Sequence, residues 1–148
     1  MDNNTNSINS AVFEDAFNML AGDKIGEGSS REVFECKIRP DLVVKVEASG
    51  VLRDFSNVME WQFHDWHRDC EDVIKWLAPI EFVSPDARIL LMKKATIATS
   101  KDQLPTKIPG FLTDRKPENF GFIDGQCVCV DYQFTVQNPS TRLTKANW

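Results

Sequence analysis

The chain has 148 residues, of which 42% are hydrophobic and 26% are charged, a composition typical of one folded domain rather than a disordered chain. Seventeen basic residues stand against 22 acidic ones, for a net charge of −5, which argues against a nucleic-acid surface. No apolar run approaches the roughly 18 residues of a membrane span, and the first residues lack the basic and apolar segments of a signal peptide, so we expect a protein of the reducing cytoplasm without membrane contact.

The first predicted elements lie ahead of the main domain. Residues 1–10 are polar and rich in Asn and Ser, so we expect a mobile tail. Residues 11–21 predict a short amphipathic helix, because their apolar side chains recur at steps of three and four residues. These side chains are Val12, Phe13, Phe17 and Leu20. We therefore divide the chain into a tail with a short helix (1–21), one domain (22–136) and a polar C-terminal tail (137–148).

A β-hairpin is predicted at the start of the domain. Its first strand covers residues 23–25 and resumes at 31–38, after an interruption that contains Gly26 and Gly28. Its second strand covers residues 42–47, which are rich in Val. The Arg-Pro-Asp sequence between the two strands has the composition of a turn, which is typical of a hairpin.

The clearest helix prediction covers residues 54–69, with Ser56 or Asn57 as the N-cap. Its broad apolar stripe is formed by Val58, Trp61, Trp66 and their aromatic neighbours. Residues 72–77 either extend the helix or form a further turn. Pro79 then ends the helical run, because proline cannot continue a helix.

Two further strands are predicted at residues 80–83 and 89–92, joined by a polar turn. Residues 93–110 are polar and contain prolines, so we expect a connector without regular structure. A short strand follows at residues 128–131. The apolar residues that could anchor the C-terminal tail are Leu143 and Trp148.

The four cysteines form no Cys-x-x-Cys pair, so zinc-ribbon and thioredoxin-type sites are excluded on spacing. Cys127 and Cys129 would face the same way on a strand, and we expect buried thiols there rather than a metal site. His64 and His67 lie three residues apart on the predicted helix, but no third ligand has metal-site spacing. A Ser-His-Asp triad stays open, although the chain has no Gly-x-Ser-x-Gly elbow.

Several polar elements occur in an order that suits a phosphate site. Gly26 and Gly28 would let backbone N–H groups approach a phosphate closely. Lys45, on the neighbouring predicted strand, can neutralise phosphate charge. Asn119 and Asp131 offer the oxygen ligands that Mg²⁺ requires. The sequence therefore indicates a phosphate site with oxygen ligands for Mg²⁺.

Asp114 begins the sequence Asp-Arg-Lys-Pro-Glu-Asn and can orient a hydroxyl group and take its proton. The order and spacing of all these elements resemble the protein-kinase signature set, over roughly residues 22–133. The resemblance implies that Asp114 is the catalytic base and that Lys116 contacts the phosphates of ATP. It also implies that Asn119 and Asp131 bind Mg²⁺.

Two further positions follow from the resemblance. Glu60, fifteen residues after Lys45, is the candidate partner of that lysine, and Met92 would lie near the gatekeeper and hinge beside the nucleotide. More narrowly, the chain resembles small phage-encoded kinase-like proteins. That resemblance rests on the motifs Gly-x-Gly-x-Ser-Arg, Val-Val-Lys-x-Glu, Glu-Trp and Leu-Thr-Asp.

The resemblance implies an α+β, protein-kinase-like fold with an antiparallel N-lobe sheet, one helix and a strongly truncated C-lobe, because only 15 residues follow Gln133. Three positions depart from the kinase pattern. Arg31 stands at the usual third glycine, and its side chain could crowd the phosphates or contact them. Thr113 replaces an arginine, and Gln133 replaces the glycine of Asp-Phe-Gly.

The leading hypothesis is a Mg-ATP-binding phosphotransferase with an unknown acceptor hydroxyl. The alternative is a pseudokinase scaffold that binds and modulates a host protein without catalysis, as the small second lobe favours. A third hypothesis is ATP binding that stabilises the fold without turnover. The four tryptophans suit an interface, but for Trp61, Trp66 and Trp76 we favour packing of the helix against the sheet.

Overall fold

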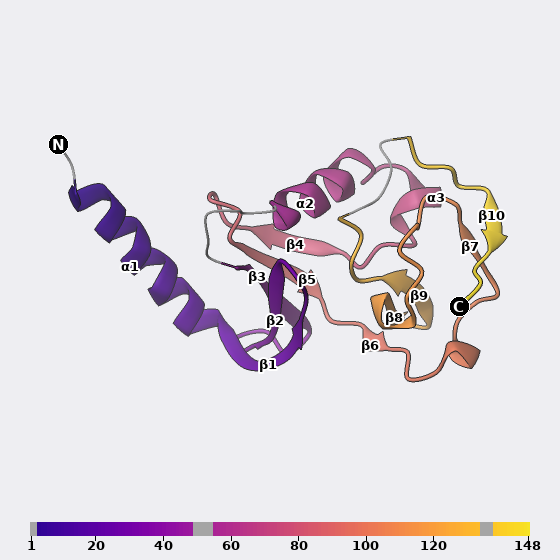
Figure 1. The fold of residues 1–148 in the computed structure, drawn as a ribbon, viewed down its shortest axis with the longest axis horizontal. Coiled ribbons are helices and arrows are strands. Elements are labelled where there is room, and N and C mark those ends of the chain that lie inside the picture. Colours follow the sequence, from indigo (N-terminus) through magenta and orange to yellow (C-terminus); the bar gives the residue numbers. More distant parts are fainter. Residues whose placement is uncertain (1–2, 49–54, 134–137) are drawn as a thin grey trace.

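The computed structural model describes residues 3–48, 55–133 and 138–148, with side chains from residue 11 onward. The chain is an α+β structure in which an antiparallel sheet and one helix form one part, and short strands form a second part beside it (Figure 1). The elements of the main sheet, in the order β1-β2-β3-β5-β4, are β1 (Ala21–Glu27), β2 (Arg31–Cys36), β3 (Leu42–Glu47), β5 (Ile89–Lys93) and β4 (Ile80–Val83).

The predicted strands 42–47, 80–83 and 89–92 are confirmed to within one residue. The first hairpin strand was predicted too short at its start, since β1 begins at Ala21 and continues through Gly26 to Glu27. Its second half ends earlier than expected, because β2 stops at Cys36.

Strand β3 explains how one segment serves both a core and a site. All six of its residues are buried, which follows from its central position between β2 and β5. Alternation along a strand sends Leu42, Val44 and Val46 to one face, where they join the core that includes Phe34. The other face carries Val43, Lys45 and Glu47 toward the second part of the molecule.

Helix α1 (Asn3–Leu20) is longer than the sequence predicts. The prediction of a tail over residues 1–10 is wrong for residues 3–10, which are helical. Phe17 packs edge-on against Phe34 at 5.2 Å between ring centroids, and this contact fixes the C-terminal part of the helix on the sheet. Extending an existing helix costs far less than nucleating one, so the polar residues continue it away from the sheet (Figure 1).

Helix α2 (Ser56–Trp66) lies along the sheet, against β3 and β4, but it turns a polar face inward. Its buried residues are Ser56, Asn57, Glu60 and Phe63. The predicted apolar stripe is largely outside, since Trp66 is 66% exposed and Trp61 is 38% exposed. The expectation that these two tryptophans pack the helix is therefore wrong, because the inner face is taken by polar contacts described below.

The predicted N-cap of α2 is also wrong. Ser56 and Asn57 lie inside the helix, and Phe55 is the N-cap, with φ of 52° and no side-chain cap bond. The backbone N–H of Asn57 instead donates to Glu47 Oε1 at 2.8 Å. A carboxylate from β3 thus satisfies a helix N-terminal donor, as side-chain oxygens generally do. Residue 54, the predicted first residue of the helix, lies outside the described residues.

The second part of the molecule contains more strands than predicted. A three-stranded sheet has the order β6-β8-β9, and β7 pairs with β10 in an antiparallel manner. The bounds are β6 (Thr96–Ile97), β7 (Lys107–Pro109), β8 (Phe120–Ile123), β9 (Gln126–Cys129) and β10 (Leu143–Lys145). The predicted connector 93–110 therefore contributes two short strands. The predicted strand 128–131 is shifted, so that Asp131 lies just after β9 rather than within it.

Three short helical elements complete the fold: α3 (Glu71–Ile74), η1 (Lys101–Gln103) and η2 (Pro117–Asn119). The C-terminal tail is anchored by Trp148, whose ring packs edge-on to Phe120 and whose Nε1–H donates to the Pro105 carbonyl at 2.9 Å. Leu143 is half exposed, so its backbone pairing with β7, and not its side chain, holds the tail there.

Candidate functional site

A cleft of about 980 Å³ opens between the main sheet and the second part of the molecule. This is at the upper end of the size of small-molecule sites. Eight of the nine residues predicted for the site line it: Gly26, Gly28, Lys45, Met92, Asp114, Lys116, Asn119 and Asp131. The ninth, Glu60, does not line the cleft. It is fully buried and forms an ion pair with Lys45. Residues 138–148 contribute nothing to the lining, so the described part of the C-terminal tail leaves the cleft open.

Lys45 reaches the cleft from β3 and meets the partner predicted for it. Its Nζ lies 2.9 Å from Glu60 Oε2, and it also donates to the Val130 carbonyl. The predicted Lys45–Glu60 pair is thus confirmed. Burial lowers the pKa of Lys45, and the charge of Glu60 offsets part of that effect.

Glu60 is the centre of the buried charges. Its Oε2 accepts from Lys45 and from Arg31 Nη1, the latter at 2.6 Å, and its Oε1 accepts from the backbone N–H of Tyr132 at 3.0 Å. Burial opposes ionisation of this carboxyl, but the charges of Arg31 and Lys45 prevail and lower its pKa to about 2. Glu60 is therefore a carboxylate throughout the neutral range.

Arg31 is the residue that the sequence prediction left undecided. Its guanidinium is 6% exposed and is held on two sides. On the helix side, Nη1 donates to Glu60 and to Asn57 Oδ1 at 3.2 Å. On the other side, Nη2 donates to Asp131 Oδ1 at 2.8 Å. Arg31 thus joins the glycine-containing loop, helix α2 and the residues after β9 in one network.

Asn57 was not predicted as a site residue, yet it fixes the frame of this network. Its side-chain nitrogen lies within hydrogen-bond distance of three carbonyls, those of Lys45, Ala87 and Arg88, at 3.0–3.3 Å. The side chain is fully buried. A buried amide bonded on all sides holds α2 against β3 and the 84–88 turn. The signal in the sequence was a polar residue at the start of a predicted helix, where it was interpreted as a possible N-cap.

Gly26 and Gly28 lie at the end of β1 and in the turn that follows. The Gly28 N–H donates to the Arg31 carbonyl at 2.8 Å, which closes the turn. Neither glycine has a positive φ, and an added Cβ would meet its nearest neighbour at 3.5 Å for Gly26 and 3.8 Å for Gly28. These are ordinary van der Waals distances. The fold itself therefore leaves room for a side chain at both positions.

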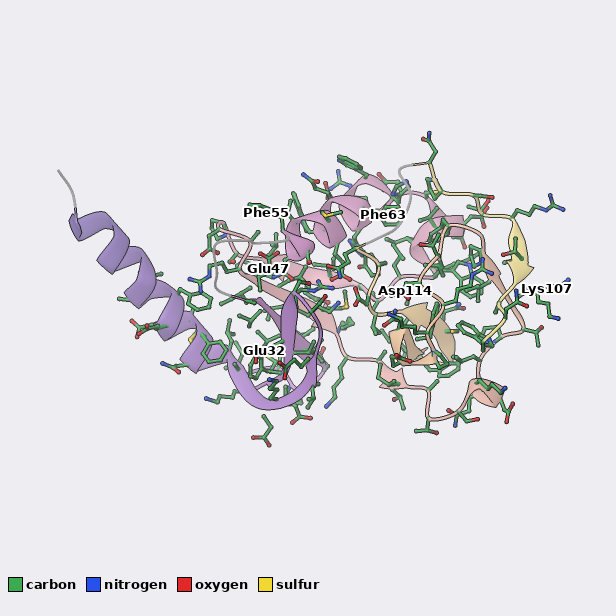
Figure 2. All side chains as sticks on the ribbon, in the orientation of Figure 1. Glu32, Glu47, Phe55, Phe63, Lys107 and Asp114 are labelled. Atoms are coloured by element: carbon green, nitrogen blue, oxygen red, sulfur yellow. The ribbon has the colours of Figure 1, made fainter. Side chains whose placement is uncertain are left out.

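The loop from Asp114 to Asn119 contributes four polar residues to the opposite wall of the cleft, namely Asp114, Lys116, Glu118 and Asn119, and Figure 2 labels Asp114 in the second part of the molecule. Asn119 Nδ2 donates to Asp114 Oδ2 at 3.0 Å, and Lys116 Nζ lies 3.5 Å from Asp114 Oδ1. Pro117 begins the 3₁₀ turn, where its fixed φ is well suited. The Asp114 carboxylate is thereby oriented and about one-third exposed.

Arg115, between these residues, faces the C-terminal tail. Its guanidinium donates to the Lys145 carbonyl at 2.6 Å and to Thr144 Oγ1 at 2.8 Å, and its Nε donates to the Leu112 carbonyl. Arg115 therefore ties the loop to β10, while its neighbours Asp114 and Lys116 line the cleft. This role was not predicted.

The resemblance implies Mg²⁺ at Asn119 and Asp131, and the two residues fit that role unequally. The Asn119 amide nitrogen is engaged by Asp114, so its oxygen is the atom that a cation could use. Asp131 fits less well, because its Oδ1 already accepts from the Arg31 guanidinium. Burial raises the pKa of Asp131, while the charges of Lys45 and Arg31 oppose that effect. The arrangement around Asp131 therefore suits an arginine rather than a metal ion.

The other candidate metal ligands are occupied by the fold. His67 Nδ1 contacts the Phe63 carbonyl at 2.8 Å, and the Ile80 N–H points to His64 Nε2 at 3.4 Å. Over the described residues, no three His, Cys, Asp or Glu side chains gather as a metal would require. The predicted buried thiols are confirmed, and burial raises the pKa of Cys127 to about 11 and that of Cys129 further.

Comparison with protein-family models and with curated protein sequences finds no match for this chain. Within the described ranges, none of the helices combines the length and the apolar character that crossing a bilayer needs.

Proposed function

We propose that this protein is a kinase-like nucleotide-binding protein whose cleft takes a nucleoside triphosphate such as ATP. The observation that carries the proposal is the convergence of residues from four distant segments on one cavity, with Lys45 held by Glu60 (2.9 Å) at its inner wall. A cytoplasmic location, where such nucleotides are abundant, belongs to the same proposal.

Three features support phosphates as the bound groups. The two glycines are not required by the fold and would let N–H groups reach a phosphate. Lys45 and Arg31 supply positive charge at the inner end of the cleft, and Lys116 supplies it from the opposite wall. Met92, which is fully buried on β5, offers an apolar contact on the sheet side, as a base would need.

The test is thermal unfolding of the full chain with ATP, in the presence and absence of Mg²⁺. A ligand at 100 times its dissociation constant adds about 2.7 kcal/mol of stability, which is a rise of several degrees for a domain of this size. Lys45→Met should abolish the shift. Lys75→Met is the matched control, because Lys75 is exposed, lies outside the lining of the cleft and pairs with Asp72 at the surface. Equal shifts in both variants would contradict the proposal.

Transfer of the terminal phosphoryl group to an alcohol acceptor is the activity that Asp114 would serve as a base. Its position on the opposite wall from Lys45 and its orientation by Asn119 support that role. The check is phosphate transfer from labelled ATP to the protein itself and to candidate acceptors, with Asp114→Asn as the inactive reference. Loss of transfer with unchanged nucleotide binding is the expected result for this variant.

The second candidate function is a scaffold that binds nucleotide and acts on a partner, such as a host protein, without catalysis. The hydrogen bond between Arg31 and Asp131 favours it, because the expected metal ligand is already engaged. Nucleotide binding without any transfer or hydrolysis, in the wild type as in Asp114→Asn, would decide for the scaffold.

A further inference from the structure

We propose that Arg31 takes the place of a divalent cation at Asp131, so that the cleft binds nucleotide phosphates directly on Arg31 and Lys45 without a metal ion. The nucleotide part of this inference rests on the proposed function. The metal part, namely that Asp131 does not bind a divalent cation while Arg31 is present, stands on the described contacts alone.

The guanidinium of Arg31 is held from two sides. Its guanidinium bonds two acceptors on α2, Asn57 and Glu60, and bonds Asp131 across the cleft. A guanidinium is planar, and it stays protonated at every pH at which proteins fold. Burial works against the charge of Arg31, but the Glu60 and Asp131 carboxylates raise its pKa above the ordinary value. Arg31 is therefore a permanent cation beside Asp131.

The charges around Arg31 balance one another. Glu60 and Asp131 carry two negative charges, and Arg31 and Lys45 carry two positive charges within the same contacts. On the opposite wall, Asp114 lies beside Lys116. Mg²⁺ is held in proteins chiefly by carboxylates together with substrate phosphates. Glu118 also lines the cleft, but the Asp131 carboxylate itself is compensated by Arg31, so less electrostatic attraction is left at Asp131 for a dication.

Moving Arg31 away from Asp131 would leave buried acceptors without a donor. A metal that took Asp131 Oδ1 would require the guanidinium to withdraw, and Asn57 Oδ1 and one bond to the fully buried Glu60 would lose their donor. Leaving buried acceptors without a partner is strongly unfavourable. The arrangement thus resists displacement by a metal ion.

Arg31 can still bind a phosphate. Counted over the described residues, its bonds use three of the five guanidinium N–H groups, and two remain. Arg31 and Lys45 both line the cleft. Arginine N–H groups match the geometry of phosphate oxygens, so the two remaining N–H groups of Arg31 can donate to a phosphate beside Lys45.

The experiment has one arm without nucleotide. Mn²⁺ binding to the full chain is measured by electron paramagnetic resonance for the wild type, Asp131→Asn, Arg31→Met and the double variant. We expect the wild type and Asp131→Asn to bind Mn²⁺ equally weakly. Arg31→Met should gain at least about tenfold in Mn²⁺ affinity, and the double variant should lose that gain. Mn²⁺ binding in the wild type that Asp131→Asn weakens about tenfold or more would overturn the inference, whether or not Arg31→Met folds.

The second arm uses ATP and the wild type alone. Calorimetric titration with ATP is run in excess Mg²⁺ and in chelator, and the two dissociation constants should agree within about threefold. A loss of about tenfold or more in chelator would overturn metal-independent binding. If ATP binds under neither condition, the proposed function fails and direct phosphate binding fails with it. The Mn²⁺ arm still decides whether Arg31 excludes a cation from Asp131.

Discussion

The Glu60 side chain and the Tyr132 backbone meet at 3.0 Å, the carboxylate accepting from the N–H. This bond places the residue directly after Asp131 against the buried face of α2. Tyr132 is held from its other end as well, since its hydroxyl donates to the Ala78 carbonyl at 2.9 Å. Glu60 thereby fixes the backbone that presents Asp131 to the cleft, in addition to pairing with two cations.

Replacing Glu60 by Gln should destabilise the fold strongly. The change leaves Arg31 and Lys45 buried without their shared counter-charge, and removing one partner of a buried ion pair costs about 3–5 kcal/mol. At 2–4 °C per kcal/mol, the midpoint of thermal unfolding should fall by roughly 10 °C. Glu32→Gln is the control, because its pair with Lys24 is exposed and worth less than about 1 kcal/mol. Equal midpoints for the two variants would show that the buried network does not support the fold.

Acid should weaken the fold through the same residue. The pKa of Glu60 is lowered from 4.5 to about 2 in the folded state, so its contribution to the free energy of unfolding is complete above pH 4.5 and is lost as the pH falls toward 2. Asp131 has the opposite effect on the free energy of unfolding. Its pKa is raised in the folded state, so lowering the pH stabilises the folded protein through this residue.

Urea unfolding of the wild type and of Glu60→Gln, measured between pH 5 and pH 2, isolates the contribution of Glu60. This pH range spans the titration expected from the lowered pKa of Glu60. The wild type should lose on the order of 3 kcal/mol more than the variant over this range. A gap between the two that stays constant with pH would mean that Glu60 titrates at its ordinary value in the folded protein.

Trp148→Ala should cost about 2 kcal/mol. The variant removes the edge contact with Phe120 and the hydrogen bond to the Pro105 carbonyl, and large-to-small changes at packed aromatic sites are costly even when burial is partial. Trp66→Ala is the matched control. Its ring is 66% exposed, so a change within about 0.5 kcal/mol is expected in chemical denaturation. The reverse order of the two effects would contradict the described anchoring of the tail.

The thiols should react in two classes. Cys70 is exposed, whereas Cys36, Cys127 and Cys129 are buried. Only the thiolate reacts, and burial further suppresses it at Cys127 and Cys129 by raising the pKa. A chromogenic disulfide reagent should therefore titrate one thiol in the native protein and the other three on unfolding. Cys70→Ser should abolish the native reaction, and rapid reaction of a further thiol in this variant would refute the burial of the other three cysteines.

Local sequence patterns predicted the strands well because each carries its own signal. The Val-rich segment of β3 and its alternation are enough to place Lys45 on one face of a central strand. The resemblance to protein kinases then implied the pair of Lys45 and Glu60, which the structure confirms. The β3 strand depends on residues that are close in the chain, and the Lys45–Glu60 pair depends on the motif pattern of protein kinases.

Helix α2 shows why the remainder could not be predicted. Its apolar residues suggested an inward Trp61 and Trp66, but the inward positions are filled by Asn57 and Glu60. Their partners come from β2, β3 and the residues after β9, so no window of sequence around the helix contains the reason. The roles of Arg31 and Asn57 were missed on the same ground, since each depends on contacts across 26 or more positions.

The contact between Arg31 and Asp131 spans 100 positions of the chain. By contrast, three of the four pairings in the main sheet join strands that are neighbours in sequence. Closure of a long loop carries an entropic cost that local pairing avoids. During synthesis, the sheet and α2 can therefore assemble while Arg31 still lacks its last counter-charge. A cleft competent to bind is consequently a late product of folding, and a nascent chain that has not yet delivered Asp131 holds an unbalanced cation at its centre.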